Sequence, residues 1–166
     1  MSYPAEAINK AFDLLPDRMD SKQTRIVHAA IGFQESAYAN RRQIITVTRN
    51  GKRVNVPEGP AASYWQFERG GGVVGVMSHR ASQQHALQVC MQRGVEFESK
   101  AVWNAMLSDD VLGAAFARLL MWTDAGALPA NQRDAWEMYL RVWRPGKPHP
   151  GKWAESYASA LRAVSK

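Results

Sequence analysis

The sequence changes its hydrophobic period once, between residues 43 and 56. Residues 43–48 are rich in β-branched side chains, residues 52–56 alternate between polar and apolar, and Asn50-Gly51 stands between the two runs. Because both residues of an Asn-Gly pair tolerate positive φ in a type I′ turn, this pattern predicts a β-hairpin. A hairpin of this size is marginally stable alone, so we expect it to pack against helices or to gain a third strand.

Helical periodicity dominates the sequence on both sides of this segment. Apolar residues recur at helical spacing over residues 5–15, and a second such run begins after Ser21 and reaches about Tyr38. Three consecutive glycines at 70–72 predict a pliable or tightly turned backbone. Further helices are expected at about 79–92, 99–107, 109–123, 131–142 and 152–164. The expected fold class is therefore mainly α (α+β), with a small β-hairpin after the second helix.

The length of 166 residues fits one domain, which we expect to span residues 1–166. The chain has 21 Lys and Arg against 15 Asp and Glu, a net charge of +6, which favours a polyanionic partner such as nucleic acid, a membrane surface or a bacterial cell wall. The basic residues are spread along the chain and match no nucleic-acid module, so no nucleic acid is expected as partner.

Several classes of protein are disfavoured by missing patterns. The apolar run at 111–122 is interrupted by Arg118 and is too short to cross a bilayer. The first residues do not read as a signal peptide, so we expect the chain to be made in the cytoplasm. We also expect it to be a monomer. The lone Cys90 excludes an internal disulfide and a cysteine cluster, and no histidine has metal-ligand spacing. Neither a metal nor a cofactor is expected.

Glu35 is the first candidate for chemistry, because it lies near the end of an otherwise apolar helix. An ionised carboxylate is costly among apolar groups, so such a glutamate tends to keep its proton. A protonated carboxyl facing a cleft could act as a general acid on a glycosidic oxygen. The alternative is a glutamate that is solvated or paired with Arg41 or Arg42.

Glu68 is a second candidate carboxylate, close to an aromatic cluster formed by Tyr64, Trp65 and Phe67 around Gln66. Two carboxyls about 6.5–9.5 Å apart support glycoside hydrolysis with inversion, and about 5–5.5 Å supports retention. Aromatic rings beside an amide suit the apolar faces of sugars, although rings at this density also serve as core. Glu68 could equally be a loop acid beside an arginine.

The order of these parts resembles the lysozyme-like superfamily, especially lytic transglycosylases and goose-type lysozymes. In that group the catalytic glutamate begins a Glu-Ser motif at a helix end, matched here by Glu35-Ser36. A following Gly-Leu-Met-Gln-type motif is similar to residues 63–66, with Gln66 at the glutamine position. Goose-type lysozymes have an aspartate two residues later, where this chain has Glu68. Residues 59–72 and 143–148 also resemble phage and prophage lysozyme-like proteins.

The resemblance implies a lysozyme-like helical domain that cleaves peptidoglycan between N-acetylmuramic acid and N-acetylglucosamine. Glu35 would be the general acid and base, and Glu68 a second acid in a hydrolase. The residues expected to bind the glycan are Ser36, Tyr64, Trp65, Gln66, Phe67 and Tyr139. Such an enzyme would reach the periplasmic wall after release from the cytoplasm or as part of a phage particle.

The sequence departs from this family pattern in two places. Ser63-Tyr64 replaces the usual Gly-Leu, and the predicted hairpin contains Thr46 and Thr48 but no acid. The missing acid favours either a transglycosylase that needs only Glu35 or a Glu35 and Glu68 pair. The alternative from another class is a non-catalytic lysozyme-like module that binds glycan or builds a virion.

Overall fold

The computed structural model describes residues 3–165 and is mainly helical, which confirms the expected fold class. Within those residues the elements follow in this order: α1 (Ala5–Asp13), η1 (Asp17–Met19), α2 (Lys22–Glu35), β1 (Ile45–Arg49), β2 (Lys52–Val56), β3 (Ala61–Ala62), β4 (Phe67–Glu68), η2 (Arg69–Val73), α3 (Val74–Ser78), α4 (Gln83–Arg93), α5 (Ser99–Ala105), α6 (Asp110–Trp122), α7 (Gln132–Trp143) and α8 (Pro150–Val164).

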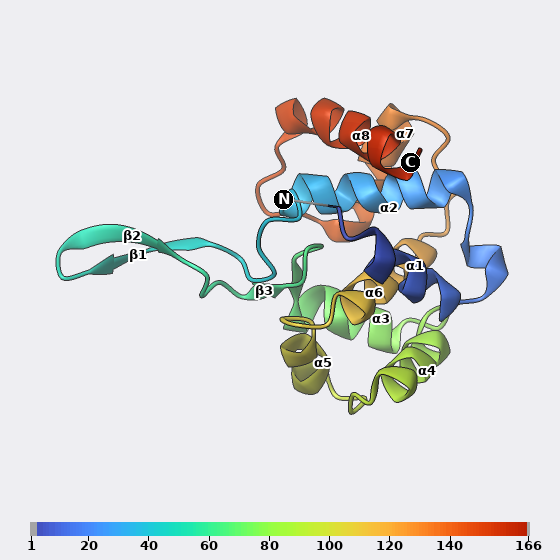
Figure 1. Cartoon of the computed structure of the whole chain (residues 1–166), viewed down its shortest axis with the longest axis horizontal. Helices are drawn as coiled ribbons and strands as arrows, with labels where there is room; N and C mark the ends of the chain where they lie inside the picture. The colour runs from blue at the N-terminus through green and yellow to red at the C-terminus, as the bar shows by residue number, and fades with distance from the viewer. Residues whose placement is uncertain (1–2, 166) are drawn as a thin grey trace.

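The helices form an upper and a lower group joined by α6 and α1 (Figure 1). The upper group contains α2, α7 and α8, with α8 packed along much of α2. The lower group contains α3, α4 and α5. One hydrophobic core runs through the described residues and draws on both groups. No helix among residues 3–165 is long and apolar enough to cross a membrane.

Helix α6 lies at the centre of the core. Every residue from Val111 to Met121 is buried, which explains why this stretch is apolar on all sides. The Asp109 side chain accepts a hydrogen bond from the Leu112 backbone N–H, as expected for an aspartate that caps a helix. Arg118 is the charged residue in this run, and its Nε donates to the Met19 carbonyl at 2.7 Å.

The predicted hairpin is present, but it neither packs against the helices nor gains a third strand within the described residues. Strands β1 and β2 pair antiparallel with Val47 opposite Val54, and Asn50 and Gly51 both have positive φ. No third strand joins the pair within residues 3–165, and the residues of β1 and β2 are exposed or partly exposed. Figure 1 shows it extending away from the helices. The expectation of packing was wrong, and the turn geometry and ladder alone define this hairpin.

The three glycines lie in a turned backbone, one of the two forms expected for them: Arg69–Val73 is a single π-helical turn, η2, that continues into the short helix α3. One further expectation about the backbone was wrong. The helix expected at 79–92 begins at Gln83, because the chain turns at His79 before it enters α4. Helix α2 ends three residues before the expected limit, and the other helices start and end within about two residues of the predicted limits.

Candidate active site

A cleft of about 1380 Å³ opens between the end of α2, the β4 to η2 segment, and α7 with the loop that follows it. This volume exceeds the roughly 300–1,000 Å³ of a typical small-molecule pocket, and it suits an extended ligand. Six of the eight predicted site residues line it: Glu35, Ser36, Gln66, Phe67, Glu68 and Tyr139.

Glu35 is the last residue of α2 and is only partly exposed. Its Oε1 accepts a hydrogen bond of 2.6 Å from the hydroxyl of Tyr139, on α7. The Tyr139 ring is 3% exposed and stacks on Trp153, with ring centroids 5.5 Å apart. The tyrosine is therefore fixed by packing, and its hydroxyl fixes the carboxylate of Glu35.

Burial is the main influence on the acidity of Glu35 and raises the pKa of its carboxyl above the usual value. The hydrogen bond from Tyr139 and the positive charge of Lys152 act in the opposite direction and are smaller. Burial also raises the pKa of Tyr139, so its hydroxyl remains a proton donor. The cleft thus contains a carboxyl that retains its proton to higher pH than an exposed glutamate.

The chain turns sharply just after Glu35, which corrects the expectation that this helix reaches Tyr38. Ala37 and Tyr38 have φ of 51° and 55°, so the helix cannot continue through them. The Tyr38 ring folds back on α2 over Gly32, where a Cβ atom would lie 2.3 Å from the Tyr38 hydroxyl. Glycine is therefore required at position 32 for the turn that exposes Glu35 at the helix end.

Ser36 connects this turn to the next part of the site. Its hydroxyl donates to the Tyr64 carbonyl at 2.7 Å and accepts from the Tyr38 backbone N–H. Through these bonds Ser36, the residue after Glu35, positions the 63–66 loop. That loop joins β3 to β4, which pair through Ala62 and Phe67.

Ser63 and Gln66 in this loop both have left-handed backbones, with φ of 65° and 53°. Left-handed positions favour glycine, so Ser63 occupies a position where a Gly-Leu-type motif would fit easily. The Ser63 side chain packs against Gly113 of α6, where a Cβ atom would lie only 2.8 Å from the serine Cβ. The Gln66 side chain bonds back to the Ser63 carbonyl at 2.8 Å.

The aromatic cluster is mostly core. Trp65 is 0% exposed and donates from its indole to the His28 carbonyl at 3.0 Å, and Phe67 is 2% exposed. Neither ring offers a face to a ligand, so the prediction that these two rings bind sugar was wrong. Tyr64 lies outside the cleft, where Arg41 stacks over its ring at 4.9 Å. The sequence could not separate these roles, because the three aromatics are nearly adjacent.

The arginines offered as partners of Glu35 bond elsewhere. Arg41 forms a two-pronged ion pair with Asp110, at 2.7 and 2.8 Å. Arg42 donates to the carbonyls of Glu58 and Gly59. Glu35 therefore has a tyrosine rather than an arginine as its direct partner. Glu68 is exposed, and lines the same cleft as Glu35.

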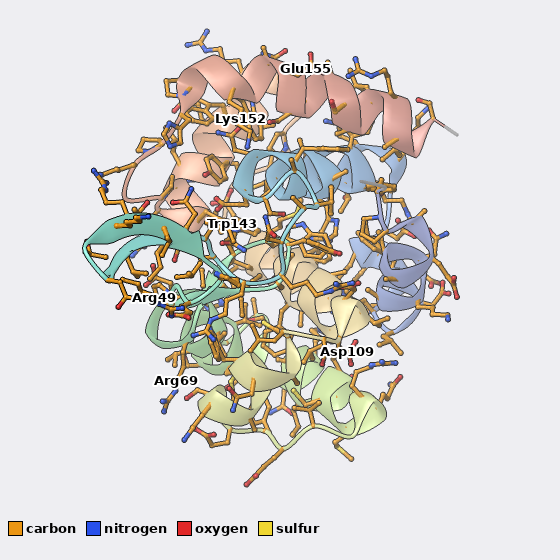
Figure 2. All side chains as sticks on the ribbon, turned by 60° about the vertical axis from the view of Figure 1, so that its left-hand side comes forward. Arg49, Arg69, Asp109, Trp143, Lys152 and Glu155 are labelled. Atoms are coloured by element: carbon orange, nitrogen blue, oxygen red, sulfur yellow. The ribbon has the colours of Figure 1, made fainter. Side chains whose placement is uncertain are left out.

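Three contributors to the site were not expected from the sequence. Gln34 joins α2 to the last helix: its Nε2 donates to the His149 carbonyl at 3.1 Å, and its own carbonyl accepts from Lys152 at 2.8 Å. The Trp143 indole donates to the Trp65 carbonyl at 3.0 Å and so joins α7 to the 63–66 loop. Figure 2 labels Lys152 on α8 and Trp143 below it, towards the middle of the molecule.

The described residues, 3–165, contain no group of three or more His, Cys, Asp or Glu side chains that could hold a metal ion. The sequence matches no protein-family model, and comparisons with the curated proteins and with the solved structures find no match. The cleft and the residues that line it are therefore the evidence for what the protein does.

Proposed function

We propose that this chain is a peptidoglycan glycosidase that cuts between N-acetylmuramic acid and N-acetylglucosamine, with Glu35 as its general acid and base. The observation that carries the proposal is the partly buried carboxyl of Glu35, with its raised pKa, in a cleft of about 1380 Å³. The similarity of residues 35–36 and 63–68 to lysozyme-like motifs supports the same reaction.

In the transglycosylase form of the reaction, Glu35 is sufficient. Its carboxyl proton moves to the leaving glycosidic oxygen as the C1–O bond breaks. The resulting carboxylate then takes the proton of the muramyl 6-hydroxyl as the C1–O6 bond forms, which closes a 1,6-anhydro ring and restores the protonated Glu35. Tyr139, at 2.6 Å, stabilises the carboxylate between the two steps.

In the hydrolase form, a water molecule replaces the 6-hydroxyl. Glu68 is the acid available to orient or deprotonate that water, because its exposed side chain lines the same cleft. The hairpin β1–β2 contributes no carboxylate, since neither strand contains Asp or Glu.

The distribution of unusual backbone conformations supports a functional site in this cleft. Residues 3–165 include six non-glycine residues with positive φ, and five of them lie in the segments around the cleft: Ala37, Tyr38, Ser63, Gln66 and Arg144. The sixth, Asn50, belongs to the hairpin turn. Non-glycine residues held in this region cost free energy and concentrate at functional sites.

The test is mass spectrometry of the soluble fragments released from purified Gram-negative peptidoglycan. We expect the wild type to release fragments and Glu35→Gln to release none while it keeps the same fold by circular dichroism. Glu96→Gln is a matched control, because Glu96 is exposed and lies outside the cleft. The control variant should cleave like the wild type.

The chemistry of the fragment ends distinguishes the two forms of the reaction. Anhydromuramyl ends would establish a transglycosylase and leave Glu68 without a necessary role. Reducing muramic ends would establish a hydrolase, and Glu68→Gln should then remove most of the activity. Activity retained by Glu35→Gln would refute the assignment of this residue. No fragments from any variant would favour a glycan-binding or virion structural module.

A further inference from the structure

The lining of the cleft carries more positive than negative charge. Three acidic side chains line it: Glu35, Glu68 and Asp124. Five cationic side chains other than histidine line it: Arg42, Arg141, Arg144, Lys147 and Lys152. A neutral glycan alone would give no reason for this excess of positive charge. The cations that have no partner within the protein are the ones free to bind a charged ligand.

Three of the five are occupied. Arg141 forms an ion pair with Asp124, with contacts of 2.7 and 3.0 Å. Arg42 donates to backbone carbonyls and lies over the Trp103 ring at 5.5 Å. Lys152 donates to the Gln34 carbonyl. These cations serve the fold around the cleft.

Arg144 and Lys147 are different. Both are exposed, and neither has an acidic group within 4.0 Å among residues 3–165. Among the described residues, the Arg144 guanidinium makes one hydrogen bond, a long one of 3.4 Å to the Arg141 carbonyl. Two cations on one loop thus line the cleft without an ion pair to any acidic side chain among the described residues.

The loop that carries them is fixed at both ends. The Trp143 indole bonds to the Trp65 carbonyl at 3.0 Å just before the loop, and Gln34 bonds to the His149 carbonyl at its end. Pro145 and Pro148 restrict the backbone between these points. The two cations are therefore kept near the helix end that carries Glu35, and little freedom of the backbone is lost when a ligand binds.

The backbone of Arg144 is a second indication that its side chain has a use. Arg144 is the C-cap of α7 and has φ 49° and ψ 53°, a left-handed conformation that glycine or asparagine usually occupies at helix ends. The fold alone would be better served by glycine there. An arginine without an ion pair at such a position indicates that its side chain serves to bind a ligand in the cleft.

We propose that Arg144 and Lys147 bind the free carboxylates of the stem peptide on the muramyl residue in the cleft. The inference rests on the proposed function for its substrate class. The peptide is attached to the lactyl group of the sugar whose glycosidic bond is cut, so its carboxylates enter the cleft beside that bond. Carboxylates are ionised at neutral pH, whereas their amides are not. The site therefore selects walls whose stem peptides are not amidated.

The experiment measures binding by full-length protein with the Glu35→Gln change, which prevents cleavage. Three probes are compared: soluble glycan strands with intact stem peptides, strands whose stem carboxylates have been amidated, and strands stripped of peptide whose exposed lactyl carboxylates have been amidated. We expect the Kd for the first probe to be roughly tenfold lower than for the other two, as two exposed charge contacts can supply. Adding Arg144→Gln and Lys147→Gln together should abolish this preference.

The matched control replaces Arg133 and Lys100 by glutamine together, which removes the same net charge from exposed positions outside the cleft. This control should keep the preference for intact strands. Equal binding of the three probes, no binding of any, or an equal loss in both double variants would overturn the proposal. If the wild type cleaves nothing but the preference depends on Arg144 and Lys147, the glycosidase is refuted and the carboxylate site stands.

Discussion

The hydroxyl of Tyr139 lies 2.6 Å from the carboxylate of Glu35, although 104 positions of sequence separate the two residues. The contact joins α7 to the end of α2 at the cleft. It lowers the pKa of a carboxyl that burial raises, so it limits how strongly Glu35 holds its proton. Several measurable consequences follow from this balance and from the groups around it.

Tyr139→Phe should raise the pKa of Glu35 further. The variant keeps the ring that stacks on Trp153 but loses the hydrogen bond that favours the ionised carboxylate. Since Glu35, the proposed general acid, then stays protonated to higher pH, the alkaline limb of the pH profile of kcat/KM should shift to higher pH. A carboxyl titration by carbon-13 NMR measures the same shift without activity. A downward or absent shift would contradict this reading of the contact.

Glu35→Gln should make the fold more stable at alkaline pH. The pKa of Glu35 is raised in the folded state, so its contribution to stability is complete below about pH 4.5 and is lost as the pH rises through the folded pKa. Wild type and variant should therefore melt alike near pH 4, and the variant should melt at a higher temperature than the wild type near pH 8. Glu96→Gln should show no such divergence in thermal unfolding.

His28 should make the fold sensitive to acid. The Nε2–H of this buried side chain donates to the Ala114 carbonyl at 3.0 Å, and Nδ1 has no partner among residues 3–165. Desolvation lowers the pKa of the imidazole from 6.5 to about 3. Its neutral form is favoured in the folded state, so stability is complete above pH 6.5 and falls as the pH drops towards 3. The loss is at most about 1.4 kcal/mol per pH unit.

The variant that tests this acid sensitivity is His28→Gln, which can still place an amide near the Ala114 carbonyl. Its unfolding free energy should depend less on pH between 6.5 and 3, although it is lower at pH 7 because the Phe12 and Trp65 rings lose their packing partner. The control His85→Gln, in α4, should keep the full pH dependence of the wild type. Urea titrations at several pH values measure both.

Gly75→Ala should separate stability from glycan binding. Gly75 lies in α3 and lines the cleft, and a Cβ atom there would meet nothing within 4 Å. Alanine should stabilise the helix by about 0.5–1 kcal/mol, yet its methyl group would project where the glycan is proposed to lie. Binding to glycan strands should weaken while the melting temperature rises.

The matched control for that change is Gly151→Ala in α8. This glycine also has open space around it but lies outside the cleft. The control should gain stability and bind glycan strands as the wild type does. Equal binding by Gly75→Ala and the control would show that no ligand approaches α3.

The periodic parts of the fold could be predicted from the sequence because they depend on local pattern. Asn50-Gly51 specifies its own turn, and the Asp109 cap and the apolar run after it specify α6. The end of α2 could not be predicted in this way. It depends on the packing of Tyr38 over Gly32, a contact whose geometry is absent from helical periodicity.

The site was predictable only in part for a similar reason. Glu35 stands out because a carboxylate is unusual at the end of an apolar helix. Its surroundings are formed by residues more than 100 positions away, among them Tyr139 and Lys152, and no local signal links them. Trp65 and Tyr64 are adjacent in sequence but face the core and the outer surface, a difference set by the turn at Ser63.

The bonds from Gln34 to His149 and Lys152 have a consequence for the timing of synthesis. A ribosome makes α2 well before α7 and α8, so a growing chain displays Glu35 before Tyr139 and Lys152 have left the exit tunnel. During that interval the carboxyl is an ordinary solvated glutamate, because neither the burial nor the partners that set its proton affinity exist. The raised pKa of Glu35 therefore arises only once α7 and α8 have docked, and the order of synthesis delays the proposed acid.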